Sequence, residues 1–381
     1  MVKLPKVYSL GSLPLSSLLA YEVSQLPKQP KVSQVVLLLN DQNKLNRFLN
    51  HDSKLYIQYQ NQINAHNLQF MASCSPPIYS TGEVAHIENL IISEPNNISL
   101  TKSINKYSKS LNPESNILLL NPSFGTVNSI YRNVWKAPNS RPNIFLGLTY
   151  ANEFKAVRGK DEFQIKINNS RLPLHLSPLP IDFGSYSYDQ DQSYSESLSN
   201  NNALIKLLTE TSINSLKSST PFSVDLRRYT YGDLLLLRLE RLITSSCIDS
   251  LTTVYDCKYN SELLEIKEFD SILKLLIKEQ VSIIYKGLSY VTKIPNNKIA
   301  LDSTRLYDMT INELKKSSVT KNGNKIAATY LNTTNVNQQT GYFVNIAAYK
   351  RLDCKLNKQI TDLVKGKISL KKRQALDHRL L

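Results

Sequence analysis

The chain has 381 residues, enough for two domains, and its hydrophobic share of 41% supports folded cores and excludes global disorder. A formal net charge of +15 favours an anionic partner such as RNA, a ribosome or an anionic membrane surface over a basic but inert surface. No segment approaches the roughly 18 apolar residues of a membrane span. The scattered cysteines include no CxxC pair and indicate neither a disulfide framework nor a zinc site, which fits a reducing compartment: Cys74, Cys247, Cys257 and Cys354.

The first element is a short apolar run at residues 6–10, which leads into Gly11-Ser-Leu-Pro-Leu-Ser16 and then a helix. This is the strand–turn–helix order of a dinucleotide-binding fold, whose fingerprint needs three glycines. Only Gly11 is present, and Leu13 and Ser16 occupy the other two positions. Leu13 would place a branched side chain where a pyrophosphate binds, and Pro14 lacks a backbone N–H that could bind it. We therefore predict a Rossmann-like domain with a degenerate loop and no cofactor.

The rest of this first domain is predicted from apolar runs and a polar insertion. Residues 163–167 alternate as an edge strand would. The low-complexity stretch 184–202 is predicted to be a flexible surface insertion without regular structure. A short helix at 202–210 and a last strand at 222–226 end the domain, which gives predicted domains at 1–226 and 227–381. Further strands are expected at 34–39, 55–59, 89–92, 116–120 and 143–150.

The second domain is predicted to be all helical. From residue 233 onward, Leu235, Leu239 and Leu242 recur at the spacing of one helical face, and an adjoining apolar stripe widens it. Such a helix should be buried at the centre of its domain. The fold class is therefore α/β, a Rossmann-like N-terminal domain followed by an all-helical C-terminal domain. Later helices are expected at 271–285, 304–316, 335–351 and 356–363, before a basic C-terminal tail.

Two segments of the helical domain resemble the ketopantoate reductases. In segment 233–264 the matching residues are Leu242, Ile248, Leu251, Thr252, Asn260, Glu262, Leu263 and Leu264. In segment 333–367 they are Thr334, Gly341, Tyr342, Val344, Asn357, Leu363, Val364 and Lys365. The resemblance implies the two-domain fold of that family, in which NADPH is the cofactor.

The polar positions of that family are changed here. The resemblance places Arg241 where the family has the Lys that protonates the substrate carbonyl, and Ser245 and Asp249 where it has Asn. Asn335 stands where it has a substrate-binding Glu, and only Asn121 keeps the family residue. A guanidinium does not release its proton near neutrality, so Arg241 is a poor general acid. We therefore predict no catalytic residues and a pseudoenzyme; the alternative is an active NADPH-dependent reductase.

The positions that bind the cofactor in that family are also changed. Reductases of this family often place an Arg after the second strand to hold the 2′-phosphate of NADPH, and Asn40 and Asp41 stand there instead. Lys44 and Arg47 in the next helix are either substitutes for that Arg or solvated helix charges. The five histidines show no metal-ligand spacing, so no metal site is expected.

A second resemblance covers nearly the whole chain. The phrases VYSLGS, VVLLLNDQNKLNRFLN, QFMASCSPPI, VYDC and LVKGK are similar to mitochondrial translational activators of cytochrome b mRNA. This resemblance implies a non-catalytic activator acting on the 5′ leader of cytochrome b mRNA and on the mitochondrial ribosome. It also implies a location on the matrix side of mitochondria, with the periphery of the inner membrane as a further expectation. The first predicted strand leaves no room for a separable presequence, so import through an uncleaved N-terminus stays open.

The C-terminal end is the most basic part of the chain. Residues 350–381 contain ten Lys or Arg against three Asp, a local net charge of +7. They contain no aromatic residue, so phosphate attraction would outweigh base stacking in any contact with RNA. A solvated basic tail and a protein-only scaffold on the ribosome or membrane are the alternatives. The RNA-binding candidates are Lys365, Lys367, Lys371, Lys372 and Arg373.

Overall fold

The structure is a computed structural model that divides into two compact units. The first comprises Met1–Ile181 and Asp189–Tyr231, and the second comprises Asp182–Tyr188 and Gly232–Leu381. The boundary predicted after residue 226 lies inside strand β12 (Ser223–Arg228), a few residues before the observed change of unit. The structure describes residues 5–27, 34–65, 69–150, 153–180, 183, 185–217, 221–316 and 334–380.

The first unit is built on an eight-stranded sheet. Neighbouring strands are parallel except at the pair β8–β11. The central strands are mostly apolar and buried along their length, as expected where helices cover both faces of a parallel sheet. In order across the sheet, the strands are β12, β11 (Arg171–Pro178), β8 (Asn143–Leu148), β7 (Asn116–Leu120), β6 (Asn89–Ile92), β1 (Val7–Leu10), β2 (Val35–Leu38) and β5 (Met71–Ser73).

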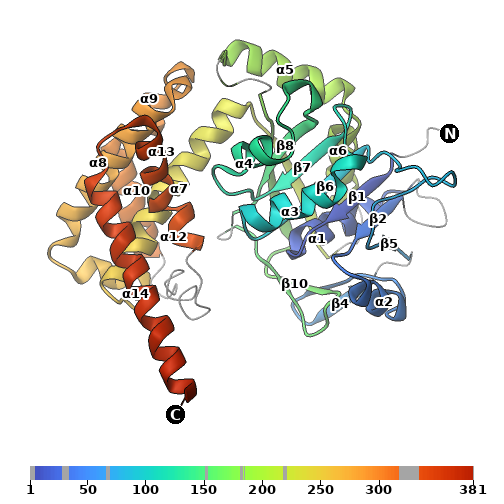
Figure 1. The fold of residues 1–381 in the computed structure, drawn as a ribbon, viewed down its shortest axis with the longest axis horizontal. Helices are drawn as coiled ribbons and strands as arrows, with labels where there is room; N and C mark the ends of the chain where they lie inside the picture. The colour runs from blue at the N-terminus through green and yellow to red at the C-terminus, as the bar shows by residue number, and fades with distance from the viewer. Residues whose placement is uncertain are drawn as a thin grey trace. The chain divides into compact units, whose positions relative to one another are not determined.

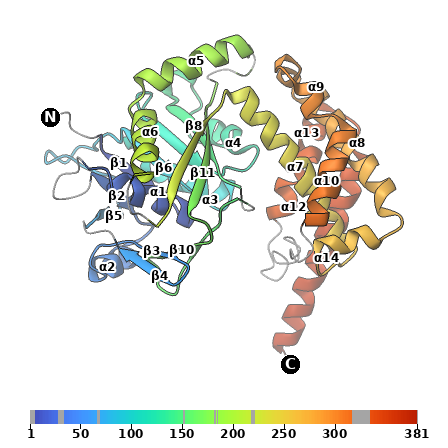
Figure 2. The ribbon, with the colours of Figure 1, turned by 180° about the vertical axis from the view of Figure 1, so that it is seen from behind.

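Helices cover both faces of this sheet. The steps from β1 to β2 and from β6 to β7 run in opposite directions, so right-handed crossovers place α1 and α3 on opposite faces. Helix α6 packs beside α1, and α4 packs beside α3. Figure 1 is seen from the α3 and α4 side, and Figure 2 from the α6 side. The bounds are α1 (Pro14–Ser24), α3 (Asn97–Tyr107), α4 (Thr126–Asn133) and α6 (Ala203–Ser215).

A second sheet of four strands lies beside the main one in the same unit. Its order is β4 (Gln62–Ala65), β3 (Tyr56–Tyr59), β10 (Gln164–Ile167) and β9 (Ala156–Arg158). Strand β10 pairs with β3 on one side and β9 on the other, so the prediction of an edge strand at 163–167 is wrong. The Phe163 ring packs edge-on against Phe48 of α2 (Gln42–Asn50), with the ring centroids 5.0 Å apart. This contact holds the small sheet against the helix that follows β2.

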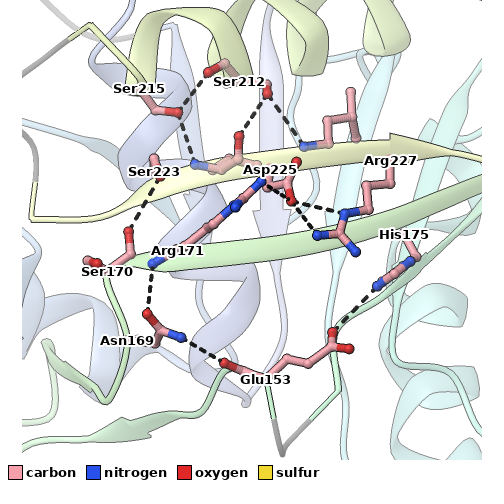
Figure 3. Close-up of polar contacts among 12 residues, drawn as sticks. Glu153, Asn169, Ser170, Arg171, His175, Ser212, Ser215, Ser223, Asp225 and Arg227 are labelled. Atoms are coloured by element: carbon pink, nitrogen blue, oxygen red, sulfur yellow. Dashed lines mark hydrogen bonds and ion pairs between the residues drawn. The ribbon is translucent and has the colours of Figure 1, made fainter.

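Serine side chains of α6 line the outer edge of the main sheet (Figure 3). Among the described residues, strand β12 pairs only with β11. On its other side, Ser212 Oγ donates to the Val224 carbonyl at 2.7 Å, and Ser215 Oγ accepts the Val224 N–H at 2.9 Å. These bonds satisfy backbone groups that an edge strand would otherwise present to solvent.

The prediction of a flexible insertion at 184–202 is wrong for most of that stretch. Residues Tyr188–Asn201 form helix α5, with acidic side chains in its first turn where the helix dipole favours them. The Tyr188 hydroxyl donates to Asp233 Oδ2 at 3.0 Å, and Asp191 Oδ1 accepts the Tyr231 N–H at 3.1 Å. These contacts anchor the start of α5 to residues around the start of α7, which composition alone does not reveal.

The second unit is all helical, as predicted. Its first helix, α7 (Tyr231–Val254), buries the predicted face: Leu235, Leu239 and Leu242 are 3%, 0% and 7% exposed. Helices α13 and α14 pack against each other and against α8. The later helices are α8 (Phe269–Gly287), α9 (Asn297–Ala300), α10 (Ser303–Lys316), α12 (Thr334–Gln338), α13 (Thr340–Lys350) and α14 (Lys355–Leu380).

Two helix predictions in this unit require correction. The helix expected at 335–351 is interrupted at Gln339, between α12 and α13. Gly341 allows a close approach there, because a Cβ at this position would lie 2.9 Å from the Val336 carbonyl oxygen. The last helix was expected to end at 363 but continues to Leu380, since Val364 and Ile368 extend its buried side with 0% and 1% exposure.

A buried amide network joins three of these helices. Gln280 of α8, Ser246 of α7 and Asn357 of α14 are all 0% exposed. Gln280 Nε2 donates to Asn357 Oδ1 at 2.8 Å and lies 3.0 Å from Ser246 Oγ. Since each helix contributes one member, the network ties the positions of α7, α8 and α14 to one another.

Candidate functional site

The degenerate loop at the end of β1 is closed against the end of β6. Gly11 has φ +130, and a Cβ there would lie 2.1 Å from the Ser93 carbonyl oxygen. The Leu13 N–H donates to that same oxygen at 3.3 Å. Pro14 begins α1, and the helix has no side-chain cap. The N–H of Leu13 is therefore engaged and that of Pro14 is missing, which weakens the helix N-terminus as a phosphate site. Ser16 Oγ bonds back to the Leu13 carbonyl at 3.3 Å.

A carboxylate occupies the surroundings of this loop. Glu94, which follows β6, is 8% exposed. Its two oxygens accept hydrogen bonds from Ser12 Oγ and Ser103 Oγ, each at 2.7 Å. An ionised carboxylate beside the loop would repel a pyrophosphate at short range.

The cations next to the loop are held by protein groups. Lys44 Nζ and Arg47 Nη2 of α2 lie 3.6 Å and 2.9 Å from the carboxylate of Glu162. Arg158 donates to the Ser12 carbonyl and to the Glu162 carbonyl, each at 2.7 Å. Burial lowers the pKa of Lys44, and Arg158 acts in the same direction while Glu162 opposes it. The side chain of Lys44 is only 12% exposed, so Lys44 is not a solvated helix charge, which was one of the two interpretations of its sequence position.

The remaining hollow at this place is small. It is lined by the loop, by β2 and by the small sheet, including Gly11, Pro14, Leu38, Lys44 and Phe163. The space open to the centre of a water molecule is about 20 Å³, enough for about one or two waters. The residues present therefore do not fit a dinucleotide, whose sites are typically several hundred Å³.

We expect no NADPH binding to the purified chain in isothermal calorimetry. The engaged Leu13 amide, Pro14, the nearby Glu94 carboxylate and the small size of the hollow all act against it. Titration with ATP serves as a control for weak anion binding to a chain of net charge +15. Micromolar affinity for NADPH, about −8 kcal/mol, would contradict this expectation.

The helical unit brings three of the family positions onto one face of α7. Arg241, Ser245 and Asp249 follow one another at intervals of four residues, which aligns them along a helix. Ser245 Oγ donates to the carbonyl of Leu242 in its own helix at 3.3 Å. Asp249 accepts a hydrogen bond from Gln339 Nε2, and burial raises the pKa of Asp249 to about 6 against the opposing effect of that bond.

The other two positions lie on different elements. Asn335 is in α12, and its side chain is outside the part that the structure describes. Asn121 follows β7 with φ +47, and its Oδ1 accepts the Thr149 N–H at 2.8 Å. This bond links the ends of β7 and β8, which gives the Asn121 side chain a structural role.

A polar cluster that the sequence did not indicate lies where β8, β11 and β12 meet (Figure 3). His175 is 5% exposed, with Nδ1 3.1 Å from the Tyr229 hydroxyl and Nε2 3.5 Å from Glu153 Oε2. On the adjacent surface, Asp225 Oδ2 lies 2.9 Å from Arg171 Nη2 and 2.8 Å from Arg227 Nη2. The cluster joins Glu153, two residues of β11 and three residues in or after β12, and these segments follow no common motif; the pairing of β11 with β8 and β12 brings them together.

The basic tail candidates separate into two groups. Lys367 Nζ donates to the Thr253 carbonyl at 2.8 Å and lies 3.2 Å from Asp256 Oδ1. Lys371 Nζ is 4.0 Å from that carboxylate. Both therefore sit at the C-terminus of α7, where a cation satisfies terminal carbonyls and the helix dipole. Arg373 is exposed, and Lys365 and Lys372 are half-buried without an ion pair among the described residues.

The helical unit and the whole chain match known proteins. Residues 233–368 match the family described as ketopantoate reductase PanE/ApbA C terminal. The chain is 39% identical over 386 residues to the Cytochrome B translational activator CBS2 of Saccharomyces cerevisiae, covering 99% of each chain. This chain belongs to the family of that activator. Both resemblances noted in the sequence are thereby confirmed.

Members of the wider fold include oxidoreductases. A probable 2-dehydropantoate 2-reductase of Schizosaccharomyces pombe is 25% identical over 376 residues, covering 97% of this chain and 98% of its own. The solved putative 2-dehydropantoate 2-reductase of Enterococcus faecalis has a TM-score of 0.64 at 13% identity, covering 97% of this chain and 99% of its own. A D-mandelate dehydrogenase bound to NADH and anilino(oxo)acetate has a TM-score of 0.61 at 12% identity, covering 96% and 99%. The predicted ketopantoate reductase-like fold is confirmed by these similarities.

Two searches of the described residues bear on other kinds of site. They contain no group of three or more His, Cys, Asp or Glu side chains arranged to hold a metal ion. In the same part of the chain, none of the helices combines the length and the apolar character needed to cross a membrane.

Proposed function

We propose that this chain activates translation of cytochrome b mRNA in mitochondria and catalyses no reaction. The observation that carries the proposal is the 39% identity to the yeast activator along 99% of both chains. The alignment runs through both units, since it covers 99% of each chain, and this favours a shared role over a shared fold alone.

The chemistry of the family positions supports a non-catalytic role. Arg241 would have to release a proton that a guanidinium keeps near neutrality. The Ser245 hydroxyl is bonded to its own helix, and the loop after β1 lacks room for a dinucleotide. The 25% identity to a probable 2-dehydropantoate 2-reductase favours the second candidate, an active NADPH-dependent reductase. The calorimetric titration separates the two.

We further propose that the activator contacts the 5′ leader of cytochrome b mRNA and the mitochondrial ribosome through basic surface residues. On α14 the contacts would come from Lys365, Lys372 and Arg373, which form no ion pair among the described residues. Lys367 and Lys371 were candidates as well, but their contacts with the end of α7 give them a stabilising role. Such a role would place the protein on the matrix side, at or near the periphery of the inner membrane.

The test is pulse-labelling of mitochondrial translation products in cells that lack this chain. We expect labelled cytochrome b to disappear while other mitochondrial products continue, and to return when the wild-type chain is supplied. A chain carrying Arg241→Lys should restore it equally well, because the proposal gives that residue no chemical step. Equal loss of all products, or no loss of cytochrome b, would overturn the proposal.

A further inference from the structure

A group of five cations lies on the α3 and α4 side of the first unit. Lys102 and Lys106 belong to α3, Lys109 to the 3-10 turn after it (Ser108–Ser110), Arg132 to α4, and Lys136 follows α4. We call this set the α3–α4 basic face. All five side chains are exposed. The surrounding segment, residues 95–152, contains six cations and one carboxylate, Glu114, which gives a local net charge of +5.

Two of the three lysines of this face belong to α3, and the third lies in the 3-10 turn that follows it. Lys106 follows Lys102 by four residues, which is the spacing of neighbours on a helical surface. The opposite side of α3 is apolar and buried through Leu100 and Ile104, 4% and 0% exposed. The lysines therefore form a row directed to solvent along the end of α3 and the turn that follows it.

The charges of this row are not neutralised within the fold. Elsewhere in the same unit Lys44, Arg171 and Arg227 pair with carboxylates at 3.6, 2.9 and 2.8 Å. None of the five cations of the face forms an ion pair among the described residues. Lys106 Nζ donates to the backbone carbonyl of Asn40 at 3.1 Å and lies 5.6 Å from the centroid of the Tyr107 ring, and its side chain stays exposed. Unpaired like charges held in a row oppose folding slightly and favour an anionic partner.

We propose that the α3–α4 basic face binds the phosphate backbone of RNA, as a second surface separate from α14. This inference rests on the proposed role in activating translation of an mRNA. An extended row of exposed cations suits a linear polyanion, because each phosphate can meet a separate cation. A membrane-binding helix would need an exposed apolar face, and among the described residues of α3 the one large apolar side chain exposed is Ile98.

The experiment measures binding of the full chain to an unstructured single-stranded RNA at several salt concentrations. Three variants are compared with wild type, each losing three positive charges. The face variant is Lys102→Gln, Lys106→Gln and Lys109→Gln. The tail variant is Lys365→Gln, Lys372→Gln and Arg373→Gln. The control variant is Lys155→Gln, Lys160→Gln and Lys166→Gln, which removes exposed lysines in or beside β9 and β10 of the same unit.

We expect the face variant to flatten the slope of log affinity against log salt by about 2, taking ~0.7 for each of three phosphate contacts. Relative to ~1 M salt, where the contribution vanishes, this is on the order of a 100-fold loss of affinity at ~0.1 M. The control variant should change the slope by less than about 0.5, since it removes the same charge from a surface outside the contact. Thermal melting of the face and control variants should match that of wild type, because the side chains replaced in them are exposed.

The other possible results would contradict the assigned surface, its RNA partner or the RNA contact itself. If wild type binds RNA and the face variant binds like wild type, the α3–α4 basic face is not the surface, while the proposed function stands. Equal weakening by the face and control variants would mean that net charge alone drives binding, and would overturn the assigned surface. If the face variant loses binding to vesicles with anionic headgroups but keeps RNA affinity, the partner is a membrane. Absence of RNA binding by wild type would overturn the RNA contact itself.

Discussion

Replacing Gly11 with alanine is expected to lower the free energy of unfolding by about 3–5 kcal/mol. The added Cβ would lie 2.1 Å from the Ser93 carbonyl oxygen, closer than any Cβ can approach backbone. Relief requires moving the end of β6 away from the end of β1, at a cost of about 1–3 kcal/mol for overpacking. The φ of +130 adds about 1–3 kcal/mol for a residue with a Cβ. Urea denaturation followed by circular dichroism measures the change.

Gly82→Ala is the matched control for this experiment. Gly82 also has a positive φ, +87, but a Cβ there would meet nothing within 4 Å. It should therefore cost only about 1 kcal/mol, from backbone conformation alone. Equal destabilisation by the two variants would show that the contact with Ser93 does not matter, and that the loop can open as the space for a cofactor would require.

Replacing Gln280 with leucine is expected to destabilise the helical unit by about 2–4 kcal/mol, because it leaves buried partners unpaired. Asn357 Oδ1 and Ser246 Oγ would lose their bonds to a side chain that is 0% exposed. The similar size of leucine keeps the cavity term small. Thermal unfolding monitored at the helical circular dichroism signal measures the effect.

A double-mutant cycle identifies the cause. If unpaired amides account for the loss, adding Asn357→Leu to Gln280→Leu should cost less than Asn357→Leu costs alone, with a coupling of about 1–2 kcal/mol. Strict additivity would show that the two side chains do not depend on each other. Leu275→Ala is a useful comparison on the same helix, since its side chain is 58% exposed and should change little.

The main strands and the central helix could be predicted because their signals are local. The apolar runs at β1, β2, β6 and β7 and the leucine spacing of α7 need no knowledge of distant residues. The small sheet could not be predicted in the same way. It pairs β3 with β10 across about a hundred residues, and the sequence of neither strand indicates which strand it pairs with. Helix α5 was missed because its composition is polar and its anchors are residues at the start of α7.

The residues of the candidate site also divide into those that a local pattern predicts and those that depend on distant parts of the chain. The missing glycines and Pro14 could be read directly from the loop, because the fingerprint is a contiguous pattern. Glu94 and Glu162 lie near that loop but come from the segments after β6 and before β10, and no motif marks them. Likewise the positive charge of the tail could be read from the sequence, but the contact of Lys367 could not. Lys367 reaches the end of α7 because the last helix continues past residue 363.

Two serines of α6 are bonded to backbone N–H and C=O groups of β12, and these bonds also limit how this edge of the sheet can bind a partner. An extended peptide joins a sheet by β-augmentation only where an edge strand offers free N–H and C=O groups in register. At β12 these groups are bonded to Ser212 and Ser215 for the width of Val224 and Leu226, and α6 covers them. Removing both hydroxyls would leave these N–H and C=O groups without their bonds beneath α6. At this edge of the sheet a partner can therefore be bound only through side chains. Charged helices bind phosphate groups in the same way.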